Sequence, residues 1–198
     1  MPQSKRVSKR AGQPRVAVVV SRYNASVTDR LCLGAIDACV RRTGRTPTVL
    51  EAPGAFELPV IAHAAAASGH FDGVVVLGCL IRGETIHDRV IADAVAEAIQ
   101  AAMIVTGVPI AFGVLTVENV KQAEARAGGD HGNKGDEAMG ALLDTVAAVN
   151  AAYAGGDSRI SRTVADKAKG RGTSKKPKPA KSKPTKSKPT KSNRGGSR

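Results

Sequence analysis

Four short segments rich in apolar and β-branched residues are spaced along the chain. Most are nearly continuous apolar runs, which is typical of strands that are buried on both faces of a sheet. The sequence therefore predicts four core strands. They are RVAVVVS (15–21), TPTVLEA (46–52), GVVVLGCLI (73–81) and PIAFGVLT (109–116).

The segments between these strands carry the signals of helices. From 89 to 106, apolar residues recur every three or four positions, which is the spacing of one helical face. Ser26, with Asp29 three residues later, resembles a capping box that opens a helix. The predicted helices cover about 26–42, an Ala-rich stretch from the turn at 53–59 to near Gly69, then 89–106, 118–128 and 134–153.

Strands that alternate with helices predict an α/β fold with a parallel sheet and helices on both faces, a three-layer αβα sandwich. Ligands of such sheets bind beyond the carboxyl ends of the strands. Polar and aromatic residues follow all four predicted strands, at 21–24, 53–57, 82–87 and 116–119. We therefore expect a binding site at this edge of the sheet.

One stretch has the length of a membrane span. Residues 98–117 contain no charged side chain, and about 20 apolar residues suffice to cross a bilayer. Gly107 and Pro109 interrupt the stretch, however, and a proline inside a helix removes a hydrogen bond. We interpret the stretch as the end of one helix, a turn and a buried strand, and we predict no membrane contact.

Charge divides the chain into three parts. The net charge is +13, from 30 basic and 17 acidic residues. Segment 1–15 has five basic residues and no acid, and segment 156–198 has 15 basic and two acidic residues, which leaves the middle with a net charge of −5. We predict a basic disordered segment at 1–14, one domain at 15–155 and a disordered Lys/Pro/Ser-rich tail at 156–198, where almost no residue is apolar.

The three cysteines are an odd number without tight spacing. This excludes a secreted scaffold stapled by disulfides and a zinc site made of cysteines. Cys32 and Cys39 lie two turns apart on a predicted helix, too far for a disulfide. The apolar run after Arg15 is too short for a signal peptide. We expect reduced thiols and a cytoplasmic protein.

Several motifs in chain order resemble the lumazine synthase family. They are Arg22-Tyr23-Asn24, PGAFELP, LGCLIRGETIH, FGVLTVENVKQAEARAG and GNKG, collinear over about 15–153. The resemblance implies a flavodoxin-like fold, pentamers that in many members build a hollow icosahedral shell, and no cofactor or metal. It also implies a reaction, the condensation of 5-amino-6-(D-ribitylamino)uracil with 3,4-dihydroxy-2-butanone 4-phosphate to 6,7-dimethyl-8-ribityllumazine, phosphate and water, in riboflavin biosynthesis.

The resemblance implies roles for individual residues. His87 is expected to carry protons, since an imidazole both gives and takes a proton near neutral pH. Arg126 is expected to bind the phosphate and to reach the site from a neighbouring subunit. The loop Gly83, Glu84 and Thr85 is expected to bind the same phosphate at a helix N-terminus. The residues expected to hold the pyrimidine and its ribityl chain are Tyr23, Asn24, Ala55, Phe56, Glu57, Leu80, Ile81, Phe112 and Lys134.

Two positions depart from the family pattern. Asp88 and Arg89 follow His87, where the family usually has an aromatic and an acidic residue, so Asp88 is a candidate to orient the imidazole. Segment 129–131 precedes GNKG, where many members carry another basic residue. These departures bear on the geometry around the histidine, on phosphate binding and on assembly.

The tail leaves alternatives open. A Lys-rich segment attracts polyanions by releasing their counterions, but without an aromatic residue it cannot stack on bases. Its partner would be nucleic acid, anionic cargo or an acidic protein, or the tail has no function. A second hypothesis for the whole chain is a non-catalytic shell-forming or nucleic-acid-associated protein, and a third is a flavodoxin-like binder of a flavin or a related ring.

Overall fold

The computed structural model describes residues 12–155. The predicted tail and nearly all of the predicted N-terminal segment therefore lie outside the described residues. The elements, in chain order, are β1 (Val16–Ser21), α1 (Ala25–Thr43), β2 (Thr48–Ala52), α2 (Leu58–Ala67), β3 (Gly73–Ile81), α3 (His87–Thr106), β4 (Ile110–Val117), α4 (Val120–Arg126), β5 (Ala127–Gly129), β6 (Gly132–Asn133) and α5 (Lys134–Tyr153).

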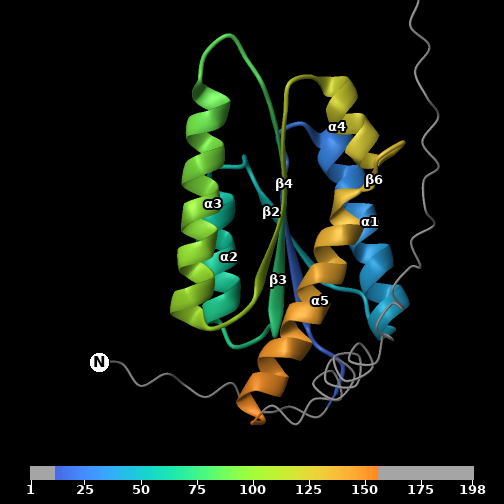
Figure 1. Cartoon of the computed structure of the whole chain (residues 1–198), viewed down its shortest axis with the longest axis vertical. Helices are drawn as coiled ribbons and strands as arrows, with labels where there is room; N and C mark the ends of the chain where they lie inside the picture. The colour runs from blue at the N-terminus through green and yellow to red at the C-terminus, as the bar shows by residue number, and fades with distance from the viewer. Residues whose placement is uncertain (1–11, 156–198) are drawn as a thin grey trace, which may run out of the picture. The chain divides into compact units, whose positions relative to one another are not determined.

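Four parallel strands form the central sheet in the order β2-β1-β3-β4. Helices α2 and α3 cover one face, and α1, α4 and α5 lie on the other (Figure 1). This confirms the predicted three-layer α/β fold. Its strand order places β1 beside β3, and the chain leaves these two strands toward opposite faces. In parallel sheets such a switch point opens a crevice at the carboxyl ends of the strands.

Strand side chains alternate between two separate cores. Val18 and Val20 pack with α1 and α5, whereas Ala17 and Val19 pack with α2 and α3. All six residues of β1 are buried, which explains why its sequence is apolar without alternation. Burial on both faces fixes the central strands, and with them the positions of the loops at their carboxyl ends.

The uncharged stretch 98–117 has the predicted structure. It contains the end of α3, a turn at Gly107 with a φ of 68°, and the whole of β4. Within residues 12–155, no helix has both the length and the apolar character needed to cross a membrane.

The predicted capping box is wrong. Helix α1 begins at Ala25, so Ser26 lies inside its first turn, and the N-cap is Asn24 in a left-handed backbone conformation. The carboxylate of Asp29 accepts a hydrogen bond from the Arg22 guanidinium at 2.9 Å instead. The Asp29 carboxylate thus pairs with the side chain of Arg22, outside the helix, and not with the backbone N–H that a capping box requires.

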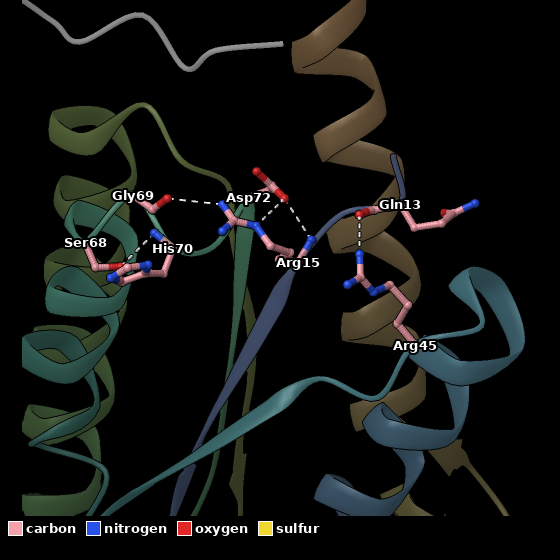
Figure 2. Close-up of polar contacts among 7 residues, drawn as sticks. All are labelled: Gln13, Arg15, Arg45, Ser68, Gly69, His70 and Asp72. Atoms are coloured by element: carbon pink, nitrogen blue, oxygen red, sulfur yellow. Dashed lines mark hydrogen bonds and ion pairs between the residues drawn. The ribbon is translucent and has the colours of Figure 1, made fainter. Parts of the chain in front are cut away.

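The amino-end edge of the sheet is closed by a cluster of bonds around Arg15 and Asp72 (Figure 2). The Arg15 N–H donates to Asp72 Oδ2 at 2.8 Å, and the Asp72 N–H donates back to the Arg15 carbonyl at 2.7 Å. The Arg15 guanidinium also donates to the Gly69 carbonyl at 3.1 Å. These bonds fix the starts of β1 and β3, at the edge opposite to the one where the sequence predicts the site.

Candidate active site

A cavity of about 550 Å³ opens at the carboxyl ends of β1 and β3. The structure brings ten of the fourteen predicted site residues to its wall. They are Tyr23, Asn24, Ala55, Phe56, Glu57, Leu80, Ile81, Gly83, Thr85 and His87. The position of this cavity, called the rim cavity below, is the one expected for a switch point.

Two aromatic rings stand at the mouth of the rim cavity. Tyr23 follows β1 and Phe56 precedes α2, and their side chains are 71% and 63% exposed. Aromatic side chains this exposed leave their flat faces free for a planar ligand. The loop that carries Tyr23 is tied to β3 by Asn24, whose Nδ2 donates to the Cys79 carbonyl at 2.9 Å.

Glu57 supplies a carboxylate beside Phe56. A side chain at Gly54 would bring its Cβ to 2.9 Å from Glu57 Oε2, so the glycine of the PGAFELP turn leaves room for this carboxylate. Glu57 is the N-cap residue of α2, but its side chain makes no capping bond. Its oxygens therefore remain available to accept hydrogen bonds from ligand hydroxyls.

His87 is the first residue of α3 and is exposed at the cavity wall. Its backbone N–H donates to Thr85 Oγ1 at 3.4 Å. Free N–H groups of a helix N-terminus favour anions, which suits a phosphate beside Gly83 and Thr85. Asp88 also lines the cavity, and its role in orienting the His87 imidazole stays a prediction. The predicted Glu84 does not line this cavity.

The loop after β3 is held against β4. The Arg82 N–H donates to the Val117 carbonyl at 2.9 Å, and the Arg82 guanidinium bonds Glu118 Oε2 at 2.6 Å. The bond to Glu118 raises the pKa of Arg82. The pairing of Arg82 with Glu118 therefore holds the loop that carries Thr85 and His87 against the end of β4.

The sequence analysis missed several lining residues, among them Cys79 on β3. Its side chain is buried, and burial raises the pKa of its thiol to about 11. The thiol is therefore protonated at neutral pH. Its position at the end of the predicted LGCLI strand, just before the predicted loop, is the sequence feature that could have placed it at the site. The other missed residues are Gly54 and Ile91.

A second cavity, of about 480 Å³, lies along β4, α4 and α5. It contains three of the four predicted residues that the rim cavity lacks, Phe112, Arg126 and Lys134. Arg126 donates to the Gln122 carbonyl at 3.1 Å, and Lys134 pairs with Glu137 at 2.5 Å. Below we call it the cationic cavity.

The two cavities differ in charge. Among the residues that line the rim cavity, all within 12–155, the ionisable side chains are Glu57, His87, Asp88, Tyr23 and Cys79, with no arginine or lysine. The cationic cavity is lined by Arg126 and Lys134 and by one carboxylate, Glu137, which pairs with Lys134, so its net charge is positive. A phosphate ester needs cationic partners, so the rim cavity is suited to a ring with hydroxyls and needs a second contributor for a phosphate.

Metal binding has little support in the described part of the chain. Across residues 12–155, no three His, Cys, Asp or Glu side chains gather closely enough to hold a metal ion. That the chain works without a cofactor stays a prediction.

Comparisons with known proteins agree on one family. A sequence model of 6,7-dimethyl-8-ribityllumazine synthase matches residues 13–150. A protein of that name from Chlorobium phaeovibrioides is 50% identical over 139 residues, which are 69% of this chain and 89% of the relative. Another from Xanthomonas oryzae pv. oryzae is 46% identical over 134 residues, 67% of this chain and 87% of the relative. A protein named 6,7-dimethyl-8-ribityllumazine synthase 1 from Caulobacter vibrioides is 45% identical over 135 residues, 67% and 88% of the two chains.

Proposed function

The chain belongs to the 6,7-dimethyl-8-ribityllumazine synthase family, and we propose that it carries out the reaction of that name. It is a transferase that condenses 5-amino-6-(D-ribitylamino)uracil with 3,4-dihydroxy-2-butanone 4-phosphate to 6,7-dimethyl-8-ribityllumazine, phosphate and water. This is the penultimate step of riboflavin biosynthesis. The observation that carries the proposal is the gathering of ten predicted site residues around one cavity.

The rim cavity is proposed to hold the uracil. Tyr23 and Phe56 offer exposed ring faces for the pyrimidine, and the carboxylate of Glu57 accepts hydrogen bonds from the ribityl hydroxyls. The backbone groups of Leu80 and Ile81, at the end of β3, are proposed to recognise the edge of the pyrimidine. Asn24 and Ala55 complete the wall beside the ribityl chain.

His87 is proposed to move the protons. An amine of the uracil attacks the ketone of the butanone to form an imine with loss of water. Loss of phosphate, ring closure and a final dehydration follow. Each step needs a proton to be given or taken at neutral pH, which an imidazole does well. His87 is exposed at the cavity wall, where both substrates would meet.

The phosphate is proposed to bind between two subunits. Gly83 and Thr85 would offer groups at the N-terminus of α3. Arg126, with Lys134 nearby, would come from the cationic cavity of a neighbour, together with Phe112. The charge difference between the two cavities supports this arrangement. The assembly proposed here is a pentamer with its sites at the subunit contacts, and closed shells of pentamers are a further possibility of the same family.

Lumazine formation tests the proposal. Wild type, His87→Ala, Arg126→Ala and a chain ending at residue 155 are mixed with both substrates, and product absorbance is followed. We expect turnover in wild type and in the truncated chain, and a fall of about a hundredfold or more in kcat/KM for the two point variants. The buried substitution Cys39→Ala, outside both cavities, is the control.

Absence of turnover above the uncatalysed background in wild type would contradict the catalytic proposal. The non-catalytic shell or nucleic-acid-associated protein would then become the leading hypothesis. If neither point substitution lowers turnover, the chain is still an enzyme, but the roles proposed for His87 and Arg126 are wrong.

For segment 156–198, polyanion binding is proposed. It is supported by composition alone, 15 basic residues against two acidic ones, and by the release of counterions when lysines neutralise phosphates. In an oligomer, several tails would act together and strengthen weak contacts. A mobility shift of nucleic acid that weakens steeply with salt, and that the chain ending at residue 155 does not produce, is the expected result. An equal shift by the truncated chain would contradict it.

The cytoplasm is the proposed compartment. The three free and buried cysteines support it, because reduced thiols persist there.

A further inference from the structure

Asn133 makes more contacts than the start of a helix requires. It ends β6, is half-buried, and immediately precedes Lys134. We infer that Asn133 is a positioning residue that fixes Arg126 and Lys134 relative to each other and thereby builds the cationic cavity. The inference rests on the proposed function, which gives Arg126 its task of binding the phosphate substrate with Lys134 beside it.

Both polar atoms of the Asn133 side chain are engaged. Its Oδ1 accepts from the backbone N–H of Gly135 at 2.8 Å and of Asp136 at 3.3 Å, which caps α5. Its Nδ2 donates to the Arg30 carbonyl at 2.9 Å, across 103 positions of sequence. A cap needs only the oxygen. The amide donor adds a bond from the start of α5 to α1.

The same side chain is enclosed by glycines. A Cβ at Gly34, on α1, would stand 2.5 Å from both polar atoms of Asn133, and a Cβ at Gly135 would collide with the Leu31 backbone carbonyl. The start of α5 thus sits directly on α1 with no room to shift. An amide bonded at both ends and packed this closely has a single position, and it fixes the backbone of Lys134, which follows it.

The backbone of Asn133 reaches toward Arg126. Asn133 pairs with Ala127 in the short antiparallel ladder of β5 and β6, and Ala127 follows Arg126 directly. The turn of this hairpin is held by the His131 N–H, which donates to the Ala125 carbonyl at 2.9 Å. One residue therefore connects α1, the end of α4 that carries Arg126 and the start of α5 that carries Lys134.

Asn119 provides a matched control. It caps α4 in the same way, since its Oδ1 accepts from the Gln122 N–H at 3.0 Å. Within residues 12–155, however, its Nδ2 donates to no protein acceptor. Replacement by Asp retains the oxygen acceptor at either site, removes the amide donor and adds a negative charge. Asn119→Asp therefore retains all the protein bonds of its side chain, whereas Asn133→Asp turns a carboxylate toward the Arg30 carbonyl.

The test compares these two variants in the full chain. For Asn133→Asp we expect KM for the butanone phosphate to rise about tenfold, because small displacements of positioning groups are costly, with KM for the uracil changed less. The lost bond to Arg30 also lowers the melting temperature, so KM is measured at a temperature at which the variant stays folded. Asn119→Asp should match wild type in all three. A residue that merely stabilises the fold would lower the melting temperature or the active fraction and leave KM unchanged.

A second measurement separates this inference from the proposed function. Inorganic phosphate is used as a probe, and the rise in melting temperature that it causes is measured. Wild type and Asn119→Asp should show the rise, and Asn133→Asp and Arg126→Ala should lose most of it. This measurement tests the role of Asn133 even if the wild type makes no lumazine.

Two results would overturn the inference. One is an unchanged KM and an unchanged phosphate effect in folded Asn133→Asp. Asn133→Ser, which retains an oxygen acceptor, removes the amide donor and adds no charge, is measured beside it and takes its place if Asn133→Asp does not fold. Failure of both to fold would make Asn133 a folding residue instead of a positioning residue.

Discussion

At the scale of the residue, Cys79 illustrates how the fold sets chemistry inside the rim cavity. Its side chain is 1% exposed, yet it lines the wall between Asn24 and Leu80. Burial disfavours a thiolate, and the pKa of the thiol accordingly rises from 9.0 to about 11. A neutral group here avoids a further negative charge beside Glu57 and Asp88.

The raised pKa predicts a dependence of stability on pH. Between about pH 9 and 11, the thiol of the unfolded chain loses its proton while that of the folded chain retains it. The unfolded state is then favoured, so the free energy of unfolding falls as pH rises through this range. Urea unfolding at pH 8, 9 and 10.5 measures it. Cys79→Ala should show a shallower fall than wild type, and equal slopes would contradict the assignment.

Single residues also mark the limit of what the sequence predicts about the site. The carboxyl-end rule for parallel sheets correctly grouped the residues after β1, β2 and β3. The rule did not predict that Arg126 and Lys134 line a separate cavity. Their position depends on how α4 and α5 pack against the sheet, which no local pattern shows. Asn133 was missed as well, although an asparagine directly before a predicted helix is a known capping signal.

At the scale of the element, the close approach of α1 and α5 depends on glycines. Gly34 lies in the middle of α1, where a glycine normally weakens a helix. Its lack of a side chain leaves the space that Asn133 fills. The cost to helix α1 is therefore offset by the contact that holds the start of α5.

This packing predicts opposite effects for two Gly→Ala substitutions. Gly34→Ala should lower the free energy of unfolding by about 2 kcal/mol, because its Cβ would overlap the Asn133 side chain. Gly140→Ala, in α5, should leave it unchanged or raise it by up to about 1 kcal/mol, since the nearest atom is a flexible Arg42 nitrogen at 3.7 Å. Urea unfolding of both variants measures the difference. Equal changes in the free energy of unfolding would show that helix propensity, and not packing against Asn133, determines the effect of both substitutions.

The order of the elements was predictable because its signals are strong. Continuous apolar strands and a helical face at 89–106 are long patterns that tertiary contacts reinforce. The hairpin of β5 and β6 was missed, since strands of two or three glycine-rich residues leave no pattern. The start of α1 was misjudged because Arg22 takes the Asp29 carboxylate, and no local motif predicts such a competitor.

At the scale of the whole molecule, the two cavities have complementary contents. The rim cavity has aromatic rings, two carboxylates and an imidazole, and the cationic cavity has an arginine and a lysine with a single carboxylate. Head-to-tail contacts around a ring would join the rim cavity of each subunit to the cationic cavity of the next. Such a site would belong to two chains, and an isolated subunit would hold only half of it.

If lumazine is made at sites shared by neighbouring subunits, oligomers mixed from two inactive variants regain activity. His87→Ala and Arg126→Ala chains are co-expressed in equal amounts, and the turnover of the purified mixture is compared with that of each variant alone. In randomly mixed rings, about a quarter of the sites combine an intact His87 with an intact Arg126.

We expect the mixture to recover about a quarter of wild-type turnover while each variant alone stays nearly inactive. A mixture no more active than the average of the two variants, in oligomers shown by mass to contain both chains, would contradict it.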